Sequence, residues 1–419
     1  MGSAGQIKAV ASKIQSLDSP SIVVLSAISG TAESLAEIAS LLRDRNPEGA
    51  RNSIAREEKK CCALIEELFS TAEAARKAKE YVRDVFAGMN SFSRDFFSDV
   101  QEHLILAQGE LLSTFLIKTI LEEQGVAAKQ LQALSFMRID RHGEPDMDAI
   151  KTALVPLLEG KATLYLTEGS ICMNSRGEVD ELGQGGADYT ACIIGAAIDA
   201  GEIQIWKDTS MVQGASEVKH LHFEEAAELA YFGADILHPT CILPARDANV
   251  PVRLLSTAAP DSPGTLIDNR LDPGTIKAVA AKDNIVAIKI KSSRMLLAHG
   301  FLRKVFEIFE SYCTPIDMIC TSEVGVSLTI DDTRYLGDII RDLKKYGIVS
   351  VDLDMCIVCV VGDMDWSNRG LESRVLGALK DIPVRMVSYG GSNFNISILV
   401  RAEDKAETLG ALSNNLFSK

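Results

Sequence analysis

The sequence has a deficit of positive charge and no long apolar segment. Its 419 residues include 43 Lys and Arg against 58 Asp and Glu, a formal net charge of −15. Surfaces that bind nucleic acid or anionic membranes need clustered Lys and Arg, so this balance argues against both kinds of partner. Apolar runs stay shorter than the roughly 18 residues of a transmembrane helix, and no basic segment precedes an apolar one as in a secretory signal. We therefore expect a cytoplasmic protein.

Cysteine and histidine form no evident framework. The chain has nine cysteines, an odd number in a long sequence, which is not the pattern of a disulfide-rich domain. Cys356 and Cys359 have C-x-x-C spacing, but they lie in the apolar segment Met355–Val361, which favours a buried strand. Strand residues three apart face opposite sides and cannot share a metal. The six histidines show no ligand spacing, so we predict no metal site built by the protein.

Helix and strand patterns alternate through the first part of the chain, and 47% of all residues are apolar, as in globular proteins. The charged segment Arg51–Phe92 contains few helix breakers and predicts an added helical hairpin. Alternation of this kind predicts an α/β fold with a mostly parallel sheet between helices. The expected helices are Gln6–Gln15, Leu111–Gln124, Ile150–Leu158, Tyr189–Ala200 and Phe223–Phe232, and the expected strands are Ser21–Ala27, Gln132–Ile139, Ala162–Thr167, Ile203–Trp206 and Val252–Leu255.

The pattern changes at Asp272-Pro273-Gly274. We predict one domain over residues 1–270, a linker at 271–283, and two small intertwined α+β modules of βαββαβ order over 284–419. The first module is expected to contain strands at Asn284–Ile290, Ile316–Ile319, Val324–Ile330 and Val349–Leu353, with helices at Phe301–Phe309 and Tyr335–Lys345. The second is expected to contain strands at Cys356–Val361, Val384–Ser388 and Ile396–Val400, with helices at Leu371–Leu379 and Lys405–Leu416.

Several segments resemble the monofunctional aspartate kinases. They are VLSAISG from Val24, QGE from Gln108, ELGQGGADYTA at Glu181–Ala191, FEEAAELAYFGADILHP at Phe223–Pro239 and GTLI from Gly264. The segments SSRMLLAHGFL, IDMICTSEVGVSLTID and SYGGSNFNIS resemble the paired ACT domains of that family. The resemblance implies an amino-acid kinase fold followed by two ACT domains. It also implies transfer of the γ-phosphoryl group of Mg-ATP to the side chain of L-aspartate, the first step of lysine, threonine and methionine synthesis.

The same resemblance shows departures at catalytic positions. The family's phosphate-binding loop, K-F-G-G-T-S, does not occur in the sequence, so we expect that loop and a central strand to be missing. The arginine of the family's G-R-G-G-S-D loop corresponds to Gln184, its serine to Ala187, and the lysine of a G-A-K segment to Asp235. An amide cannot replace the bidentate pairing of an arginine with a carboxylate. An anion in place of a cation repels a polyphosphate.

Other family segments are altered as well. The Thr-Asn pair reads Ala32-Glu33, G-F-I reads Gly169-Ser170-Ile171, D-P-R reads Ser216-Glu217-Val218, and W-T-D-x-D-G reads Trp206-Lys207-Asp208-Thr209-Ser210-Met211. Lys207 and Asp208 therefore occupy the expected nucleotide-binding segment. Two interpretations of Lys207 are open. It partly replaces the lost positive charge beside the nucleotide, or it is an ordinary solvated lysine.

Other positions of the family pattern are retained, namely Glu110, Gly185, Gly186, Asp188 and Asp208. Gly185-Gly186 would cradle an anion with backbone N–H groups at the start of the next helix, or form an ordinary turn. Because the changes fall on catalytic positions and spare the framework, we predict weak or no phosphotransfer. The alternative is a pseudokinase that binds an amino acid and regulates a catalytic aspartate kinase.

The resemblance implies a regulatory site in the ACT region, where the family binds an amino acid, often lysine, between subunits. Asp317 would pair with the ligand's ammonium group, and the helix after Gly300 would face its carboxylate. The other polar positions are Thr321, Ser322 and Glu323, and the apolar positions are Met295, Phe301 and Leu302. The alternative is that these residues are ordinary parts of the ACT framework and bind no ligand. Ligand binding at a subunit interface would imply a homodimer.

Overall fold

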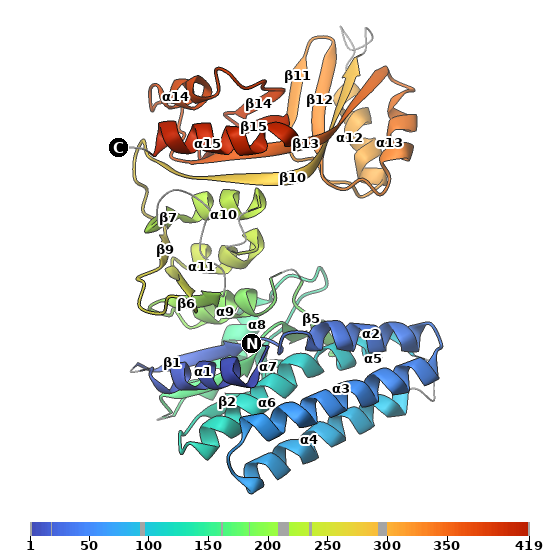
Figure 1. Cartoon of the computed structure of the whole chain (residues 1–419), viewed down its shortest axis with the longest axis vertical. Coiled ribbons are helices and arrows are strands. Elements are labelled where there is room, and N and C mark those ends of the chain that lie inside the picture. Colours follow the sequence, from blue (N-terminus) through green and yellow to red (C-terminus); the bar gives the residue numbers. More distant parts are fainter. Residues whose placement is uncertain are drawn as a thin grey trace. The chain divides into compact units, whose positions relative to one another are not determined.

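The structure, a computed structural model, describes residues 2–17, 19–92, 97–160, 162–183, 185–207, 218–233, 237–291 and 300–417. The chain divides into two compact units, which are described separately (Figure 1). The first contains Met1–Ile203 and Thr240–Val250, and the second contains Gln204–Pro239 and Pro251–Lys419. The second unit thus begins well before the boundary predicted near residue 270, because strands and a helix from Gln204–Pro239 pack with the C-terminal part of the chain.

The first unit contains a parallel sheet of order β1-β3-β2. Strands β1 (Ser21–Leu25) and β2 (Lys129–Leu131) both pair with β3 (Leu164–Glu168), which is buried along its whole length, as is usual for a central parallel strand. A hairpin of β4 (Ile171–Met173) and β5 (Val179–Glu181) follows. The helices are α1 (Ala4–Gln15), α2 (Thr31–Arg43), α3 (Pro47–Leu68), α4 (Ala72–Ser91), α5 (Asp99–Leu106), α6 (Gln108–Glu123), α7 (Ala133–Phe136), α8 (Met147–Leu158), α9 (Gly186–Ala197) and α11 (Leu243–Asp247).

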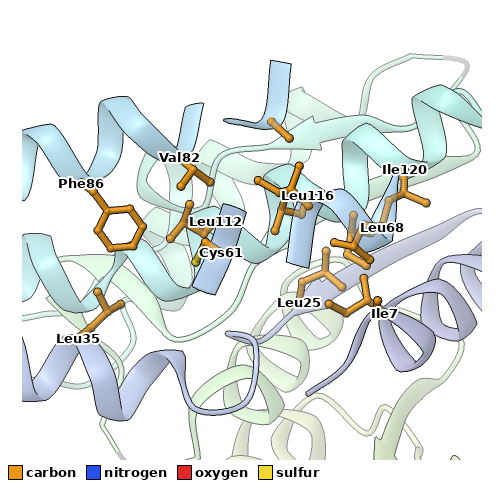
Figure 2. Packing of buried hydrophobic residues seen from close by; sticks show 14 of the residues in the cluster. Ile7, Leu25, Leu35, Cys61, Leu68, Val82, Phe86, Leu112, Leu116 and Ile120 are labelled. Carbon is orange, nitrogen blue, oxygen red and sulfur yellow. The ribbon is translucent and has the colours of Figure 1, made fainter. Parts of the chain in front are cut away.

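Helices α3 and α4 form the helical hairpin predicted from the charged segment. Their apolar stripes pack on α1, α2 and α6, where side chains such as Ile7, Leu68, Phe86 and Leu116 share one core (Figure 2). Each helix begins at a side-chain cap: Asn46 accepts from the Gly49 N–H, and Thr71 accepts from the Ala74 N–H. The hairpin is therefore an integral part of the first unit.

One apolar stretch is longer than the sequence prediction allowed. Asp99–Glu123, which spans α5 and α6, is long and apolar enough to cross a membrane by length and composition alone. In this fold 61% of its apolar window is buried. Ile105, Leu112 and Leu116 belong to the core of the first unit, so the stretch packs as a core helix.

The strand predicted at Gln132–Ile139 is wrong. The chain leaves β2 at Leu131 and forms the short helix α7, after which Arg138 and Ile139 make isolated bridges only. The cause is the buried carboxylate of Glu168 at the end of β3. It accepts from the Gln130 side chain at 2.8 Å and from the Ala133 N–H at 2.7 Å, which turns the chain at this point.

The second unit begins with a mixed sheet of order β6-β8-β9-β7. Strand β7 (His220–His222) pairs in parallel with β9 (Thr265–Asp268), and β8 (Val252–Ser256) pairs antiparallel with β9; β6 (Ile203–Lys207) lies at the other edge. Helix α10 (Phe223–Tyr231) follows β7. The single sheet expected for the first 270 residues thus occurs as separate sheets in the described residues.

The rest of the second unit is built on one six-stranded sheet, the C-terminal sheet, of order β11-β12-β10-β13-β15-β14. Its two central strands are long and antiparallel, β10 (Ile276–Lys291) and β13 (Ile348–Gly362). The others are β11 (Ile319–Ser322), β12 (Gly325–Ile330), β14 (Met386–Tyr389) and β15 (Asn395–Arg401).

Each long strand serves both predicted modules. The second half of β10 pairs with β12, while its first half pairs with the second half of β13, and register shifts near Lys282–Ala287 separate the two halves. Three boundaries are corrected as a result. Residues 276–283 of the expected linker are strand, the strands predicted at Val349–Leu353 and Cys356–Val361 are one strand, and β11 begins at Ile319, where the predicted strand ended.

Helices α12 (Phe301–Ser311) and α13 (Leu336–Leu343) cover the first module, and α14 (Leu371–Ala378) and α15 (Lys405–Leu416) cover the second. Cys356 packs with Val358 and Val360 in the core beneath α14 and α15. Cys359 instead accepts a hydrogen bond from the Ser397 hydroxyl at 3.8 Å. The two cysteines therefore face opposite sides of β13, as the sequence predicted.

Candidate functional site

In the first unit, the chain segment after β1 meets the first turn of α6. The Ser113 hydroxyl donates to the Ser26 carbonyl at 2.7 Å, and a Cβ at Gly109 would lie 3.0 Å from the Ala27 Cβ. The Ala27 backbone and the Ser170 side chain lie near the Glu110 carboxyl, and both favour its charged form. Glu110 is therefore fixed at the end of β1, beside the segment that leaves β3.

The segment after β3 packs against the start of α9. A Cβ at Gly169 would lie 2.5 Å from the Ala187 Cβ, so only glycine fits. Ser170 has a φ of 62°, a costly conformation outside glycine. It is held by hydrogen bonds from its N–H to the Thr190 hydroxyl at 2.9 Å and from the Leu182 N–H to its carbonyl at 2.6 Å. Strain maintained in this way is common at functional sites.

Gly185, Gly186, Ala187 and Asp188 lie together at the N-terminus of α9. Gly185 has a φ of 110° and precedes the helix, and a Cβ at Gly186 would lie 2.9 Å from the Ser170 hydroxyl oxygen. Asp188 lies in the first turn, where a carboxylate is stabilised by the helix dipole. The predicted loop and Glu110 are thus brought to the same place through Ser170, a residue noted in the sequence only as a lost aromatic position.

The electrostatics around Glu110 are negative. Burial, reinforced by the nearby Glu181 carboxyl, raises the pKa of Glu110 from 4.5 to about 7. Partial burial also raises the pKa of Glu181, which the His103 imidazole opposes and Asp180 reinforces. The His103 Nδ1 lies 3.7 Å from the Asp180 Oδ1, and His103 is the basic side chain near Glu181 in the described residues. The arrangement favours a cationic or neutral group beside Glu110 over an anion.

Among the predicted nucleotide residues, Lys207 lies in the part of the chain that the structure describes. Gln184, Asp208 and Asp235 lie outside the described residues. Lys207 ends β6, and its carbonyl accepts from the Thr257 N–H at 2.9 Å. It belongs to the second unit, while Glu110 and Gly185–Asp188 belong to the first.

Asp317, the predicted ligand for an ammonium group, already has an internal cation. Its Oδ1 lies 2.6 Å from the Lys282 Nζ and accepts from the Tyr231 hydroxyl at 3.0 Å. Burial lowers the pKa of Lys282, but hydrogen bonds to Asp317 and Asp331 outweigh it and raise that pKa overall. Burial and the Asp317 carboxylate raise the pKa of Tyr231 to about 12, so its hydroxyl remains a donor.

The other predicted regulatory residues that the structure describes lie on β11, on α12 and in the turn from β11 to β12. Thr321 and Ser322 are exposed residues of β11, opposite Val326 and Gly325, and Glu323 is exposed in the turn to β12. Phe301 is buried in the core of the first module, while Leu302 is exposed on α12, and Met295 lies outside the described residues. Sequence reasoning missed Lys282 and Tyr231. No local pattern links them to Asp317, which is 35 and 86 residues away along the chain.

Comparison with known proteins identifies the family. The amino acid kinase family matches residues 1–256, and an ACT domain matches residues 358–416. The lysine-sensitive aspartokinase 3 of Escherichia coli is 34% identical over 335 residues, which cover 75% of this chain and 75% of that protein. The aspartokinase of Chlamydia trachomatis is 30% identical over 421 residues, 95% and 92% of the two chains. This chain belongs to the aspartokinase family.

Solved aspartokinase structures agree with the fold. E. coli aspartokinase III in complex with aspartate and ADP, in its R-state, superposes with a TM-score of 0.80 at 29% identity, covering 100% of this chain and 97% of that one. The same protein with lysine and aspartate, in its T-state, gives a TM-score of 0.79 at 29% identity over the same shares. The amino-acid kinase fold with a C-terminal ACT region, predicted from the sequence, is confirmed.

Proposed function

We propose that this aspartokinase-family chain phosphorylates aspartate weakly or not at all. The observation that carries the proposal is the partly buried Glu110 carboxyl with the Glu181 carboxyl nearby, and Asp180 next to Glu181 in turn. The reaction brings a dicarboxylic acid to a triphosphate, and its transition state needs positive groups near both. The sequence replaces the family's arginine by Gln184, and Gln184 carries no charge.

Mg-ATP is the cofactor that the family implies. Its metal would arrive on the nucleotide, and in the described parts of the chain no group of three or more His, Cys, Asp or Glu side chains is placed to hold a metal ion. Asp208 and Asp235 of the expected nucleotide segments lie outside the described residues, and the described carboxyls of Glu110 and Glu181 do not fit a polyphosphate.

A coupled ADP-release assay with Mg-ATP and L-aspartate tests this proposal, with E. coli aspartokinase III as the positive control. We expect turnover about 10²–10³-fold below that of the control, the usual loss when one charge-stabilising donor is removed. Gln184→Arg should recover part of the rate, whereas Glu123→Gln, remote from this site, should not. Turnover at the control's rate that disappears in Asp208→Ala would contradict the proposal.

A regulatory role is the second candidate, supported by the state of the C-terminal half. That half keeps a complete sheet and two buried cores, one for each module. In this proposal the chain binds an amino acid through the ACT region, forms a homodimer there, and modulates a catalytic aspartokinase in the cytoplasm. Calorimetry with lysine, threonine and methionine, together with co-purification with a catalytic aspartokinase, tests it. If these experiments find no ligand and no partner, the regulatory role is refuted.

A further inference from the structure

Residues 269–275 carry the chain from β9 to β10, and side chains of other segments hold this connection on two sides (Figure 1). On one side, the Gly274 N–H donates to the Asp363 Oδ2 at 2.8 Å, after the end of β13. On the other side, Asp272 faces the ring of His220 in β7. The connection between the mixed sheet and the C-terminal sheet is therefore tied back to β7 through a histidine.

The His220 ring lies between two carboxylates. Its Nε2 is 2.8 Å from the Asp268 Oδ1 at the end of β9, and its Nδ1 is 3.1 Å from the Asp272 Oδ2. A neutral imidazole has one N–H and one lone pair, whereas an ionised carboxylate only accepts hydrogen bonds. With a neutral ring, one nitrogen would face a carboxylate oxygen with no proton between them. An imidazolium donates to both carboxylates.

Both carboxyl groups are held in the ionised form. Hydrogen bonds from the Lys277 ammonium group and from His220 lower the pKa of Asp272. Burial raises the pKa of Asp268, but hydrogen bonds from His220 and Arg270 outweigh it and lower that pKa overall. The Arg270 Nε donates to the Asp268 Oδ2 at 2.8 Å. Each carboxylate thus has a further cation of a type that stays charged near neutral pH, and the group between them is of the type that titrates there.

Helix α10 adds a third carboxyl group to this cluster. Glu225 is 1% exposed, and its Oε1 has no hydrogen-bond partner among the described residues. Its Oε2 accepts from the His222 N–H at 2.7 Å. Burial raises the pKa of Glu225, which this hydrogen bond, Lys277 and His220 oppose. Charge on His220 therefore also offsets the cost of burying this carboxyl group.

His222, two residues further along β7, provides a contrast. Its Nδ1 accepts from the Glu224 N–H at 3.2 Å where α10 begins, so this nitrogen carries no proton. Its ring stacks on Phe394 with 5.1 Å between the ring centroids. Burial lowers the pKa of His222, although Glu224 and Asp268 oppose the effect. One short strand thus carries a histidine held neutral beside one placed to hold two protons.

Loss of the second proton from His220 would act on every element packed around it. The titratable and charged groups that face the ring are Asp268 of β9, Arg270 and Asp272 of the connection, Lys277 of β10, Glu225 of α10 and His222 of β7. A neutral ring can donate to one carboxylate only. The shorter contact to Asp268, whose side chain is 19% exposed, would remain, and Asp272, 48% exposed, would turn to solvent.

We propose that His220 is a protonation-dependent clamp, which ties the β9–β10 connection to β7 while its ring carries two protons and releases Asp272 when it loses one. One link between the mixed sheet and the C-terminal sheet therefore depends on pH. Because the folded contacts favour the charged ring, the stability that the clamp supplies is present in weakly acidic and neutral solution. It is lost as the pH rises through the titration of folded His220. The proposal rests on contacts inside the second unit and holds whether or not the chain transfers phosphate.

The first test uses the full chain labelled with nitrogen-15 in its histidines. Ring nitrogen shifts in the NMR spectrum distinguish an imidazolium from a neutral imidazole, and His220→Gln and His222→Gln assign the two rings. We expect His220 to carry protons on both nitrogens at about pH 7 and His222 to carry one. A neutral pattern for His220 at that pH would overturn the proposal.

Hydrogen exchange then measures the connection itself. The reporters are the Gly274 N–H and the Asp363 N–H, which donates to the Thr275 carbonyl at 2.9 Å. Exchange is followed from about pH 6 to about pH 9 and corrected for its intrinsic dependence on pH. We expect the protection of both amides to fall about tenfold as His220 titrates, as for a lost hydrogen bond to a charged group. Protection that stays constant across this titration would show that His220 does not act as a clamp.

Two variants separate the histidine from the ion pair beside it. His220→Gln should show at about pH 6 the low protection that the wild type reaches at about pH 9, with no step between them. Lys277→Met removes the other cation from Asp272, so protection should fall at every pH while the step remains. A step that persists in folded His220→Gln, or that disappears in folded Lys277→Met, would refute the clamp. If neither variant folds, the wild-type titration decides alone.

Discussion

Neutralising Glu110 should stabilise the first unit at alkaline pH. The Glu110 carboxyl is partly buried at the start of α6 and close to Glu181, so its charged form is disfavoured in the folded state. Glu110→Gln keeps the shape of the side chain and one oxygen that can still accept hydrogen bonds. The substitution removes the charge and retains the packing.

The magnitude follows from the pKa of this carboxyl, which the fold raises from 4.5 to about 7. Each pKa unit corresponds to about 1.4 kcal/mol, so ionised Glu110 destabilises the folded state by about 3 kcal/mol. Between these two pKa values the folded state holds the proton more tightly than the unfolded state. Stability from this group is therefore greatest below pH 4.5, falls as the pH rises, and becomes constant above pH 7. Glu110→Gln should remove this fall and gain up to about 3 kcal/mol at pH 8.

The assay must report on the first unit alone, and both tryptophans, Trp206 and Trp366, lie in the second. Urea unfolding at pH 5 and pH 8 is therefore read by pulse labelling of amides in α6, with every pulse at one fixed pH. The control is Glu123→Gln, because hydrogen bonds from Ser70 and Thr71 outweigh burial and lower the pKa of Glu123. The control should lose stability at pH 8. If Glu110→Gln gains nothing at pH 8, the burial argument for this carboxyl is refuted.

Two glycine substitutions test the packing of the site and of α10. Gly169→Ala places a Cβ 2.5 Å from the Ala187 Cβ and should cost about 1–3 kcal/mol in the same α6 labelling experiment. At Gly5 no atom lies within 4 Å of an added Cβ, so Gly5→Ala should not lower the stability of the first unit. An equal loss of stability in Gly169→Ala and Gly5→Ala would contradict the packing argument. Gly233→Ala combines a φ of 93° with a contact of 2.7 Å to the Ala281 carbonyl oxygen. It should lower second-unit stability by about 1–3 kcal/mol, measured by tryptophan fluorescence in urea, and an unchanged midpoint would show that α10 does not pack tightly on β10.

The elements that depend on local pattern could be predicted from the sequence. The helical hairpin of α3 and α4, the buried strand at β13 and the opposed faces of Cys356 and Cys359 follow from apolar periodicity. The order of motifs also identified the family. Such features are set by residues close together in the chain, so they can be predicted without knowing how the chain packs.

Tertiary structure alone decided how distant groups pair. The buried Glu168 carboxylate turned an expected strand into α7, and a register shift let one strand serve two modules. Asp317, which the sequence predicts as a ligand for an ammonium group, has the Lys282 Nζ 2.6 Å from its Oδ1, a contact that no local pattern predicted. A buried charge takes whichever partner the fold brings within hydrogen-bond distance, and that distance is fixed by packing between segments that are far apart in sequence. No periodicity or motif encodes it.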